Sequence, residues 1–559
     1  MASDNNHAPG DSVPGLRSVG SSTIGLAATG AFLLWAALPP LDLWPLAWAA
    51  PVPWVLLVGR PNLAGRRPYL GLWLVGFLFW LAAIHWLRLP DPATSLGWLA
   101  LSFYLGFYLP VFVGLGRVAV HRLRVPVVLA APVVWTGLEL ARAHLITGFS
   151  MGALGHTQYR WTDLIQISDL GGAYAVDFVV MCVAACLARM MPLEDRRPAW
   201  WPALPIVLIL AATVVYGRMR IALGQAATDE PPVRIALIQG SIDSTLKYDE
   251  TRKSQVHGDY LRLSHDAVDR YGRLDLIVWP ETMFRSKLVT FDGAPQVPAS
   301  WNWSPEQFTT ALAEASRSSR EAMASLAEEL GAPLLLGVDT EHYGARGLKR
   351  YNSAAHVTRD GRLAARYDKM HRVMFGEYVP FAERFPWLQD LTPLPSSITA
   401  GRQPVALDVG RLRISPNICY ETVLAHVIRR HVTTLARAGQ EPDVLVNLTN
   451  DGWFWGSSEL DMHLACGVFR AVETRKPLLI AANTGFSAWI DADGRILAKG
   501  PRRAEDVLLA EVRPDPRKSW YVAFGDVPAS LCLFACFVLA AAGFWKDVGR
   551  SSQAVTLRS

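Results

Sequence analysis

The sequence predicts a polytopic α-helical membrane domain, with about eight membrane-crossing helices, joined to one external α/β domain of layered sheet and helix. Composition is the first observation. Of 559 residues, 51% are hydrophobic and only 18% are charged, which is too apolar for an ordinary soluble protein. The second observation is where the apolar residues lie. Long apolar runs fill residues 22–217, whereas short apolar segments alternate with helical segments from residue 233 to residue 512.

The membrane domain is predicted from successive apolar runs, each near the ~20 residues that cross a bilayer. Seven runs precede the α/β domain and one follows it: 22–39, 42–59, 69–87, 95–116, 126–143, 171–191, 200–217 and 526–545. Pro39-Pro40 divides the first two, which are short enough to pair as a broken hairpin. Residues 1–21 lack the apolar core of a secretory signal, so a disordered tail is expected there. Residues 218–232 and 513–525 are predicted to be linkers.

Basic residues are unevenly divided between the two sets of connecting loops. The alternate loops contain only Arg88, Arg142 and Arg160. The other loops and the two tails contain Arg17, Arg60, Arg66, Arg67, Arg117, Arg122, Arg124, Arg189, Arg196, Arg197, Lys546, Arg550 and Arg558. By the positive-inside rule both termini, including the tail 546–559, are cytoplasmic. Seven crossings then place the α/β domain outside the cytoplasm.

Strands and helices alternate through residues 233–512, which indicates an α/β domain large enough to bury its own core. Strands are predicted at 233–238, 274–279, 333–338, 352–358, 412–418, 443–448, 478–482 and 486–490, and helices at 251–271, 305–331, 421–438 and 458–474. Neither a glycine-rich dinucleotide fingerprint nor a phosphate-binding loop is present, so nothing indicates a nucleotide site.

Cys419 is the strongest candidate for a catalytic residue. It lies between a predicted strand and a predicted helix, and such a turn exposes a side chain beside helix N–H groups that favour a thiolate. Glu281 follows another predicted strand, and Lys369 comes shortly after Tyr367. A carboxylate, an ammonium and a thiol in one domain indicate covalent acyl transfer. Taken singly, each has an ordinary interpretation as a loop carboxylate, a surface ammonium or a core thiol.

The other cysteines are expected to be structural. Cys466 lies in a predicted helix and is expected to be core, although a disulfide with Cys419 is an alternative that would block the nucleophile. The remaining four fall in predicted membrane helices, where they pack as small residues: Cys182, Cys186, Cys532 and Cys536. No cysteine or histidine cluster has metal-ligand spacing, so no metal is expected.

Several short motifs accompany these three residues. They are Gln239-Gly240, Trp279-Pro280-Glu281-Thr282, Phe375-Gly376-Glu377-Tyr378-Val379-Pro380-Phe381, Asn450-Asp451-Gly452-Trp453-Phe454 and Asn483-Thr484-Gly485. With the Glu-Lys-Cys set they resemble the nitrilase superfamily, and the flanking membrane helices narrow the resemblance to its apolipoprotein N-acyltransferase family. The likeness covers nearly the whole chain. Two positions depart from the family pattern: Tyr248 stands where tryptophan is usual, and Ser150-Met151 stands where Pro-Trp is usual.

The resemblance implies an αββα sandwich in the bacterial cytoplasmic (inner) membrane, with the catalytic domain on the periplasmic side. It also implies ping-pong acyl transfer without a cofactor. A phospholipid gives a fatty acyl chain to the enzyme as a thioester, and the acyl group passes to the N-terminal amine of a diacylglyceryl apolipoprotein. The expected partners are therefore the phospholipid donor, the apolipoprotein acceptor and the bilayer. One chain, as a monomer, would hold a full site.

The residue types suit these steps. Cys419 is expected to be the nucleophile, and Glu281 the general base for the thiol and later for the incoming amine. Lys369 offers positive charge to the tetrahedral oxyanion, helped by the backbone N–H of Tyr420. Glu377 is expected to orient Lys369 or the amine, with a solvated loop carboxylate as the alternative.

The remaining site candidates are weaker. Tyr420 and Glu421 flank the nucleophile and either support it or begin a helix, since an early acidic residue suits the helix dipole. Asn450 and Trp453 are candidates for the acyl-chain pocket, with loop packing as the alternative. Tyr248 is assigned to lipid contact. Apolar loops are expected to keep water from the thioester and to meet the bilayer, namely Trp301-Asn302-Trp303, Met374-Phe375 and Trp453-Phe454-Trp455.

Ionisable residues within the membrane runs are functional candidates by default. Glu139 and Arg142 lie three residues apart, and they either pair with each other or bind a lipid headgroup. Asp177 lies within the sixth run, and His156 and Arg160 follow the fifth as candidates for phosphate contact.

Two other functions remain open from the residues. A membrane-tethered nitrilase-type amidase would use the same three residues to hydrolyse a small C–N substrate. A lipid-binding or transport protein would use the external domain as a scaffold. A nucleic-acid partner is not expected, because the net charge is only +5 and topology explains the clustered arginines.

Overall fold

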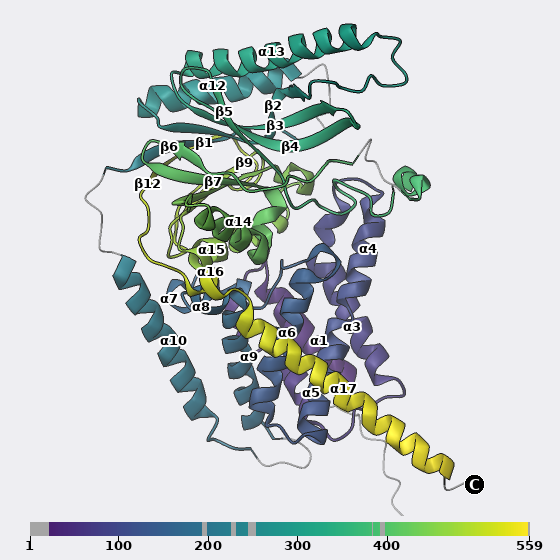
Figure 1. Ribbon diagram of the computed structural model, residues 1–559. Coiled ribbons are helices and arrows are strands. Elements are labelled where there is room, and N and C mark those ends of the chain that lie inside the picture. The colour runs from purple at the N-terminus through teal and green to yellow at the C-terminus, as the bar shows by residue number, and fades with distance from the viewer. Residues whose placement is uncertain are drawn as a thin grey trace, which may run out of the picture.

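The computed structural model describes residues 22–192, 198–224, 231–243, 253–382, 384–391 and 397–556. A layered α/β part is stacked on a bundle of apolar helices, with α10 along one flank of the bundle and α17 crossing it diagonally (Figure 1). The main helices of the bundle are α1 (Thr23–Ala37), α2 (Val52–Gly59), α3 (Pro68–Ala83), α4 (Thr94–Leu105), α5 (Tyr108–Arg117), α6 (Val127–His144), α9 (Ala173–Met190), α10 (Ala203–Gly224) and α17 (Val527–Thr556). Short helices α7 (Thr162–Ile165), α8 (Ser168–Gly171) and α16 (Trp520–Phe524) lie between the bundle and the α/β part.

The apolar helices differ in length from the predicted crossings. Among the described residues, four stretches are long and apolar enough to cross a membrane: 94–122, 173–190, 203–224 and 527–544. Three shorter apolar stretches cover 23–37, 44–59 and 68–83. The predicted run 42–59 is a short helical turn, η2 (Trp44–Trp48), followed by α2. The structure therefore supports a membrane-crossing bundle but not a count of eight crossings.

Small residues let the bundle helices approach closely. A Cβ atom at Gly137 of α6 would lie 2.7 Å from the carbonyl oxygen of Cys532 in α17, which is closer than such atoms approach. Glycine at this point therefore allows α17 to pack directly on α6. Close backbone contact of this kind is typical of helices that associate in lipid. Lipid chains are as apolar as the helices, so close packing rather than the hydrophobic effect holds the helices together.

The α/β part consists of two six-stranded sheets. The first has the order β12 (Asp506–Val512), β1 (Val233–Gln239), β2 (Leu276–Phe291), β3 (Leu334–Gly344), β4 (Gly347–Val357), β5 (Leu363–Asp368). The second has the order β11 (Ile496–Lys499), β10 (Ala488–Ile490), β9 (Leu478–Ala482), β8 (Val444–Thr449), β7 (Leu412–Ile418), β6 (Leu407–Val409). In each sheet the central strands are parallel and the flanking strands antiparallel.

Helices cover the outer face of each sheet, which gives the expected αββα layering (Figure 1). Helices α12 (Lys253–Tyr271) and α13 (Pro305–Leu330) pack on the first sheet, whereas α14 (Ala425–Arg437) and α15 (Glu459–Thr474) lie between the second sheet and the bundle. Apolar side chains fill the space between the sheets, including Leu237, Val278, Ile414, Val446 and Leu479. Each such side chain contributes about 1.5–3 kcal/mol when fully buried. This layer therefore holds the two sheets face to face.

Helix α15 belongs to both parts of the molecule. Its residues are buried along the whole length, and Phe469 shares one apolar cluster with Val180 of the bundle and Val423 of the α/β part. At its end, Arg475 donates to Asp169 of α8 at 2.8 Å, and both side chains are fully buried. The two parts therefore share a core and a buried ion pair.

The predicted strands and helices are confirmed in kind, with three corrections. The strand predicted to end before Glu281 continues through it to Phe291, with shifts in register after Trp279. The helix predicted from residue 421 begins at Ala425, after a short turn, η9 (Cys419–Val423). Strands β5, β6, β11 and β12 were not predicted.

Candidate active site

Cys419 lies immediately after β7, in the turn η9, with a backbone φ of +51°. A non-glycine residue rarely adopts this left-handed conformation, and such strain is concentrated at functional sites. Burial raises the pKa of the Cys419 thiol well above its usual range, and the Glu281 carboxylate raises it further. The expectation that helix N–H groups favour a thiolate was therefore wrong, because α14 begins only at Ala425 and desolvation dominates. The thiol is neutral at rest and needs a base.

Glu281 lies at an irregularity in β2. The pairing of β2 with β3 shifts between Trp279 and Phe284, and Thr282 has a φ of +55°. One oxygen of the carboxylate accepts a 2.6 Å hydrogen bond from Asn352, and the other accepts one from the backbone N–H of Asn450 at 3.0 Å. These two bonds fix the carboxylate in one orientation.

Lys369 follows β5 and is only 1% exposed. Its ammonium lies 2.7 Å from Glu377 and 3.4 Å from Glu281. Burial by itself would lower the pKa of Lys369, but the two carboxylates hold that pKa well above its ordinary value. The ammonium therefore keeps its charge beside the thiol, where an oxyanion would form.

Glu377 is not a solvated loop residue. One of its oxygens accepts from Lys369 and the other from the backbone N–H of Val373 at 2.8 Å. Burial raises the pKa of the Glu377 carboxyl, although the neighbouring ammonium opposes this. Glu377 therefore contacts Lys369 directly, and its expected role of orienting Lys369 or the amine stays a prediction.

Glu421 ties the nucleophile segment to the lysine segment. Its two carboxylate oxygens accept from the backbone N–H groups of Ile418 at 2.7 Å and Met370 at 2.8 Å. The same carboxylate accepts from His371 N–H at 2.9 Å and from the Tyr367 hydroxyl at 2.8 Å. Burial raises the pKa of this carboxyl. Glu421 therefore sets the spacing between Cys419 and Lys369, a role well beyond that of a helix-start residue.

Tyr420 connects the nucleophile to the bundle. Its hydroxyl donates to the carbonyl of Gly148 at 2.9 Å. The loop around Gly148 is held by Arg142, which donates to the carbonyls of Phe149 at 3.0 Å and Met151 at 2.9 Å. Arg142 also pairs with Glu139, and both are buried. The Glu139–Arg142 pair thus supports the loop against which Tyr420 rests.

The other candidates from the sequence are distributed as follows. Asn450 is 2% exposed and accepts from Asn483 at 2.9 Å, so its side chain is engaged within the protein. Trp453 is half-buried in the turn that follows. Tyr248 lies outside the described residues. Asp177 accepts from the Gly155 N–H at 2.6 Å, while Arg160 pairs with Asp42.

Sequence reasoning missed several polar residues that hold the site together. Asn352 orients Glu281, and Asn447 donates to the side chain of Asn417 at 2.7 Å and to the carbonyl of Cys419 at 3.1 Å. Asn417 and Asn447 are paired on adjacent parallel strands. The sequence does indicate them, because an asparagine within a predicted buried strand usually has a hydrogen-bonding role.

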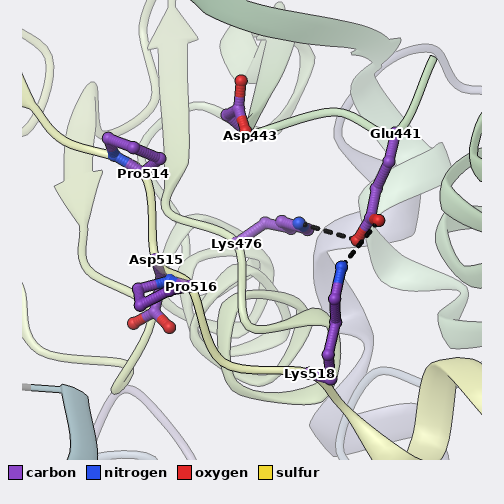
Figure 2. Close-up of a pocket in the computed structure, with 7 residues that line it drawn as sticks. All are labelled: Glu441, Asp443, Lys476, Pro514, Asp515, Pro516 and Lys518. Atoms are coloured by element: carbon purple, nitrogen blue, oxygen red, sulfur yellow. Dashed lines mark hydrogen bonds and ion pairs between the residues drawn. The ribbon is translucent and has the colours of Figure 1, made fainter. Parts of the chain in front are cut away.

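Cys466 is buried, as expected, and the alternative of a disulfide with Cys419 is not observed, because both cysteines are free. A surface cavity of about 250 Å³ is lined by other residues than those of the candidate site (Figure 2). In Figure 2, Glu441 accepts from Lys476 at 3.0 Å and from Lys518 at 2.8 Å, so both ammonium groups are already paired. The cavity is lined by Glu441, Asp443, Lys476, Pro514, Asp515, Pro516 and Lys518.

Comparisons with known proteins match both parts of the chain. Residues 30–186 match the model of the apolipoprotein N-acyltransferase N-terminal domain, and residues 234–521 match that of carbon-nitrogen hydrolases. An apolipoprotein N-acyltransferase of Rhodopirellula baltica is 33% identical, over 90% of this chain and 94% of that protein. One from Geobacter metallireducens is 35% identical, over 93% and 95%. An amidase structure from Nesterenkonia sp. is 16% identical with a TM-score of 0.36, covering 55% of this chain and 98% of that one.

Proposed function

The chain belongs to the apolipoprotein N-acyltransferase family, and we propose that it transfers a fatty acyl chain from a phospholipid, through a thioester on Cys419, to the N-terminal amine of apolipoproteins. The observation that carries this proposal is the position of Lys369. Its buried ammonium lies between Glu281 and Glu377, next to the strained cysteine turn, in a chain whose other part is a bundle of apolar helices.

In the first half-reaction Glu281 takes the proton of the Cys419 thiol, and the sulfur attacks the ester carbonyl of the phospholipid. The negative charge that develops on the carbonyl oxygen is stabilised by Lys369 and the backbone N–H of Tyr420. Collapse of the tetrahedral intermediate breaks the ester C–O bond. The lysophospholipid leaves with the proton held by Glu281, and the acyl chain stays on sulfur.

In the second half-reaction the α-amine of the diacylglyceryl-cysteine attacks the thioester carbonyl. Glu281 takes a proton from the amine, the C–S bond breaks, and the sulfur recovers that proton. An amide is released and the free thiol is restored. Both half-reactions use the same three residues, so one chain contains every group that the chemistry needs.

Exposed aromatic side chains lie on several loops of the α/β part and support a lipid substrate. Phe381 is 75% exposed and Trp387 60% exposed, both on the segment after Glu377. Phe385 on the same segment is also exposed, and further exposed aromatics lie elsewhere: Trp301, Trp303, Phe375 and Trp455. Exposed apolar groups in such numbers mark a membrane or lipid contact. We assign them to entry of acyl chains and to exclusion of water from the thioester.

The proposed topology has eight crossings, with seven in residues 22–217 and one in 526–545, and the catalytic domain 233–512 on the periplasmic side. Both termini are cytoplasmic in this arrangement. The apolar helices support a membrane-crossing bundle, and the count and orientation rest on the apolar runs and on the arginine distribution in the loops. Reaction of single introduced cysteines in the loops with a membrane-impermeant maleimide, on intact spheroplasts, tests it; labelling of the loop 60–68 would contradict it.

The experiment that tests the function is intact mass of the reduced, detergent-solubilised protein after incubation with phospholipid. A gain of one fatty acyl group, removed by hydroxylamine and absent in Cys419→Ser, is expected. Addition of a diacylglyceryl peptide with a free amine should then discharge the adduct. No adduct, together with release of ammonia from small amides, would instead support the nitrilase-type amidase.

A further inference from the structure

A chain of three polar side chains lies behind the nucleophile, and none of them is needed for the steps above. Thr449 ends β8, the strand parallel to β7, and the pairing of Ile418 with Leu448 places Thr449 beside Cys419. The Thr449 hydroxyl donates to Asp451 at 2.7 Å, and the same Asp451 oxygen lies 3.2 Å from Nδ1 of His463 on α15. Thr449, Asp451 and His463 are all at least 96% buried.

The Thr449 hydroxyl has one proton and two lone pairs. While that proton is directed to Asp451, the oxygen can only accept a hydrogen bond from the neutral thiol. When the thiol loses its proton, the hydroxyl can rotate and donate to the sulfur. In the tautomer with its proton on Nδ1, His463 donates to Asp451, so this carboxylate keeps a partner in the rotated state.

We propose that Thr449 is a switchable hydrogen-bond donor to the Cys419 sulfur, and that Asp451, oriented by His463, is the positioning residue that holds its proton away until the thiol ionises. This inference rests on the proposed role of Cys419 as nucleophile. It adds a fourth catalytic group, because the Thr449 hydroxyl contacts the reacting atom. Thr449 then stabilises both the attacking thiolate and the departing thiolate of the second half-reaction.

The groups around the Cys419 thiol indicate that Thr449 and Asp451 shift its pKa in opposite directions. Glu281 and Lys369, on the first sheet, and Asp451, after a strand of the second, act electrostatically on the thiol. The negative charges of Glu281 and Asp451 raise the pKa of the thiol, whereas Lys369 and the hydrogen bond from Thr449 lower it. Behind Asp451 the nearest further acid is Glu459, whose pKa is raised by burial and by Asp451 itself.

The test is the pH dependence of Cys419 alkylation by iodoacetamide in the full-length detergent-solubilised enzyme, with the modified residue identified by mass spectrometry. Thr449→Val removes the donor and should raise the apparent pKa of the thiol by about one unit, the size of a hydrogen bond to a charged group. Thr449→Ser should restore the parent profile. Asp451→Asn removes the competing charge and releases the hydroxyl, and should lower the apparent pKa.

Opposite shifts are the signature of the proposed switch, because general loosening of the fold would move all variants in one direction. Asp461→Asn is the matched control: it makes the same carboxylate-to-amide change on α15, where Asp461 pairs with Arg502, and should leave the profile unchanged. Thermal unfolding of each variant confirms that the comparison is between folded proteins. Shifts of one sign, or failure of serine to rescue, would overturn the proposal.

Two further outcomes are informative. Ligand atoms of Asp451, Glu459 and His463 lie within 4.8 Å of one another. One equivalent of a divalent metal per chain in the purified protein, lost in Glu459→Gln, would overturn the proton switch, because the ion would take the Asp451 oxygen from Thr449. Alkylation needs no lipid, so opposite shifts without any acyl adduct would refute the proposed lipid donor while leaving the switch intact.

Discussion

The Lys369 ammonium donates a 2.7 Å hydrogen bond to the Glu377 carboxylate. It lies farther, 3.4 Å, from Glu281, which also binds Asn352 and the backbone of Asn450. The Lys369 ammonium therefore pairs more closely with Glu377 than with Glu281, the proposed base. This leaves Glu281 free to accept a proton, while Lys369 remains charged for the oxyanion.

Replacing Glu377 with glutamine should slow formation of the acyl adduct by about 10–100-fold, less than the ~10²–10⁴ that a general base contributes. The reason is that Lys369 would pair fully with Glu281 and weaken it as a base. Single-turnover acylation measures the effect. Glu341→Gln is the matched control, since Glu341 pairs with Lys287 away from the proposed site. Equal rates for Glu377→Gln and the parent enzyme would contradict the assigned role.

Lys369→Met should lower the acylation rate by about 10²–10³-fold, the usual effect of losing one donor to an oxyanion. It should also destabilise the fold by about 3–5 kcal/mol, because removal of one partner of a buried ion pair leaves its carboxylates uncompensated. Adding Glu377→Gln to Lys369→Met should recover part of the stability without recovering activity. Thermal unfolding and single-turnover rates separate the two effects, and recovery of both together would refute the role of Lys369 in chemistry.

Glu421→Gln should reduce the free energy of unfolding by about 3 kcal/mol, since hydrogen bonds to a charged group contribute about 1.5–3 kcal/mol each. The amide has one accepting oxygen instead of two, so the link between Ile418 and Met370 is broken. Acylation should fall as well, because Cys419 and Lys369 lose their fixed spacing. Tyr367→Phe removes only one donor to Glu421 and should have a smaller effect on both measurements. An equal loss in the two variants would argue against the bridging role.

Because the pKa of the Cys419 thiol is raised, the folded protein should lose stability as the pH becomes alkaline. In the unfolded chain the thiol ionises near pH ~8.5, whereas in the folded protein it keeps its proton to higher pH. Its contribution to stability is therefore fully present below the unfolded pKa and is lost as pH rises toward the folded pKa. Unfolding midpoints between pH 7 and pH 10 should decline more in the parent enzyme than in Cys419→Ala. A parallel decline in the two proteins would show that the thiol is not shifted.

The sequence predicted the elements around the nucleophile because their patterns are local. The apolar strand before Cys419 and the strand that leads to Glu281 could be recognised from a few consecutive residues. The edge strands were not predicted, because their local patterns are weak. β5 contains the charged residues Arg366 and Asp368, which obscure the alternation of apolar and polar residues that identifies a strand. β6 is only three residues long.

The relations between distant residues could not be predicted from local patterns. Asn352 contacts Glu281 across 71 positions of the chain, and Tyr420 contacts Gly148 across 272. Both contacts exist because strands and loops converge in three dimensions. The thiol was expected to ionise readily, since burial does not show in a short string of residues, and desolvation reverses that expectation.

Because α15 is packed on one side by the second sheet and on the other by the bundle, the catalytic region is not an autonomous folding unit. Cutting the chain near residue 231 would expose the apolar face of α15 and leave Arg475 without its buried partner Asp169. A truncated fragment made for crystallisation or screening would therefore aggregate unless that face were redesigned. The helical bundle therefore stabilises the folded catalytic region through this shared helix, in addition to anchoring it.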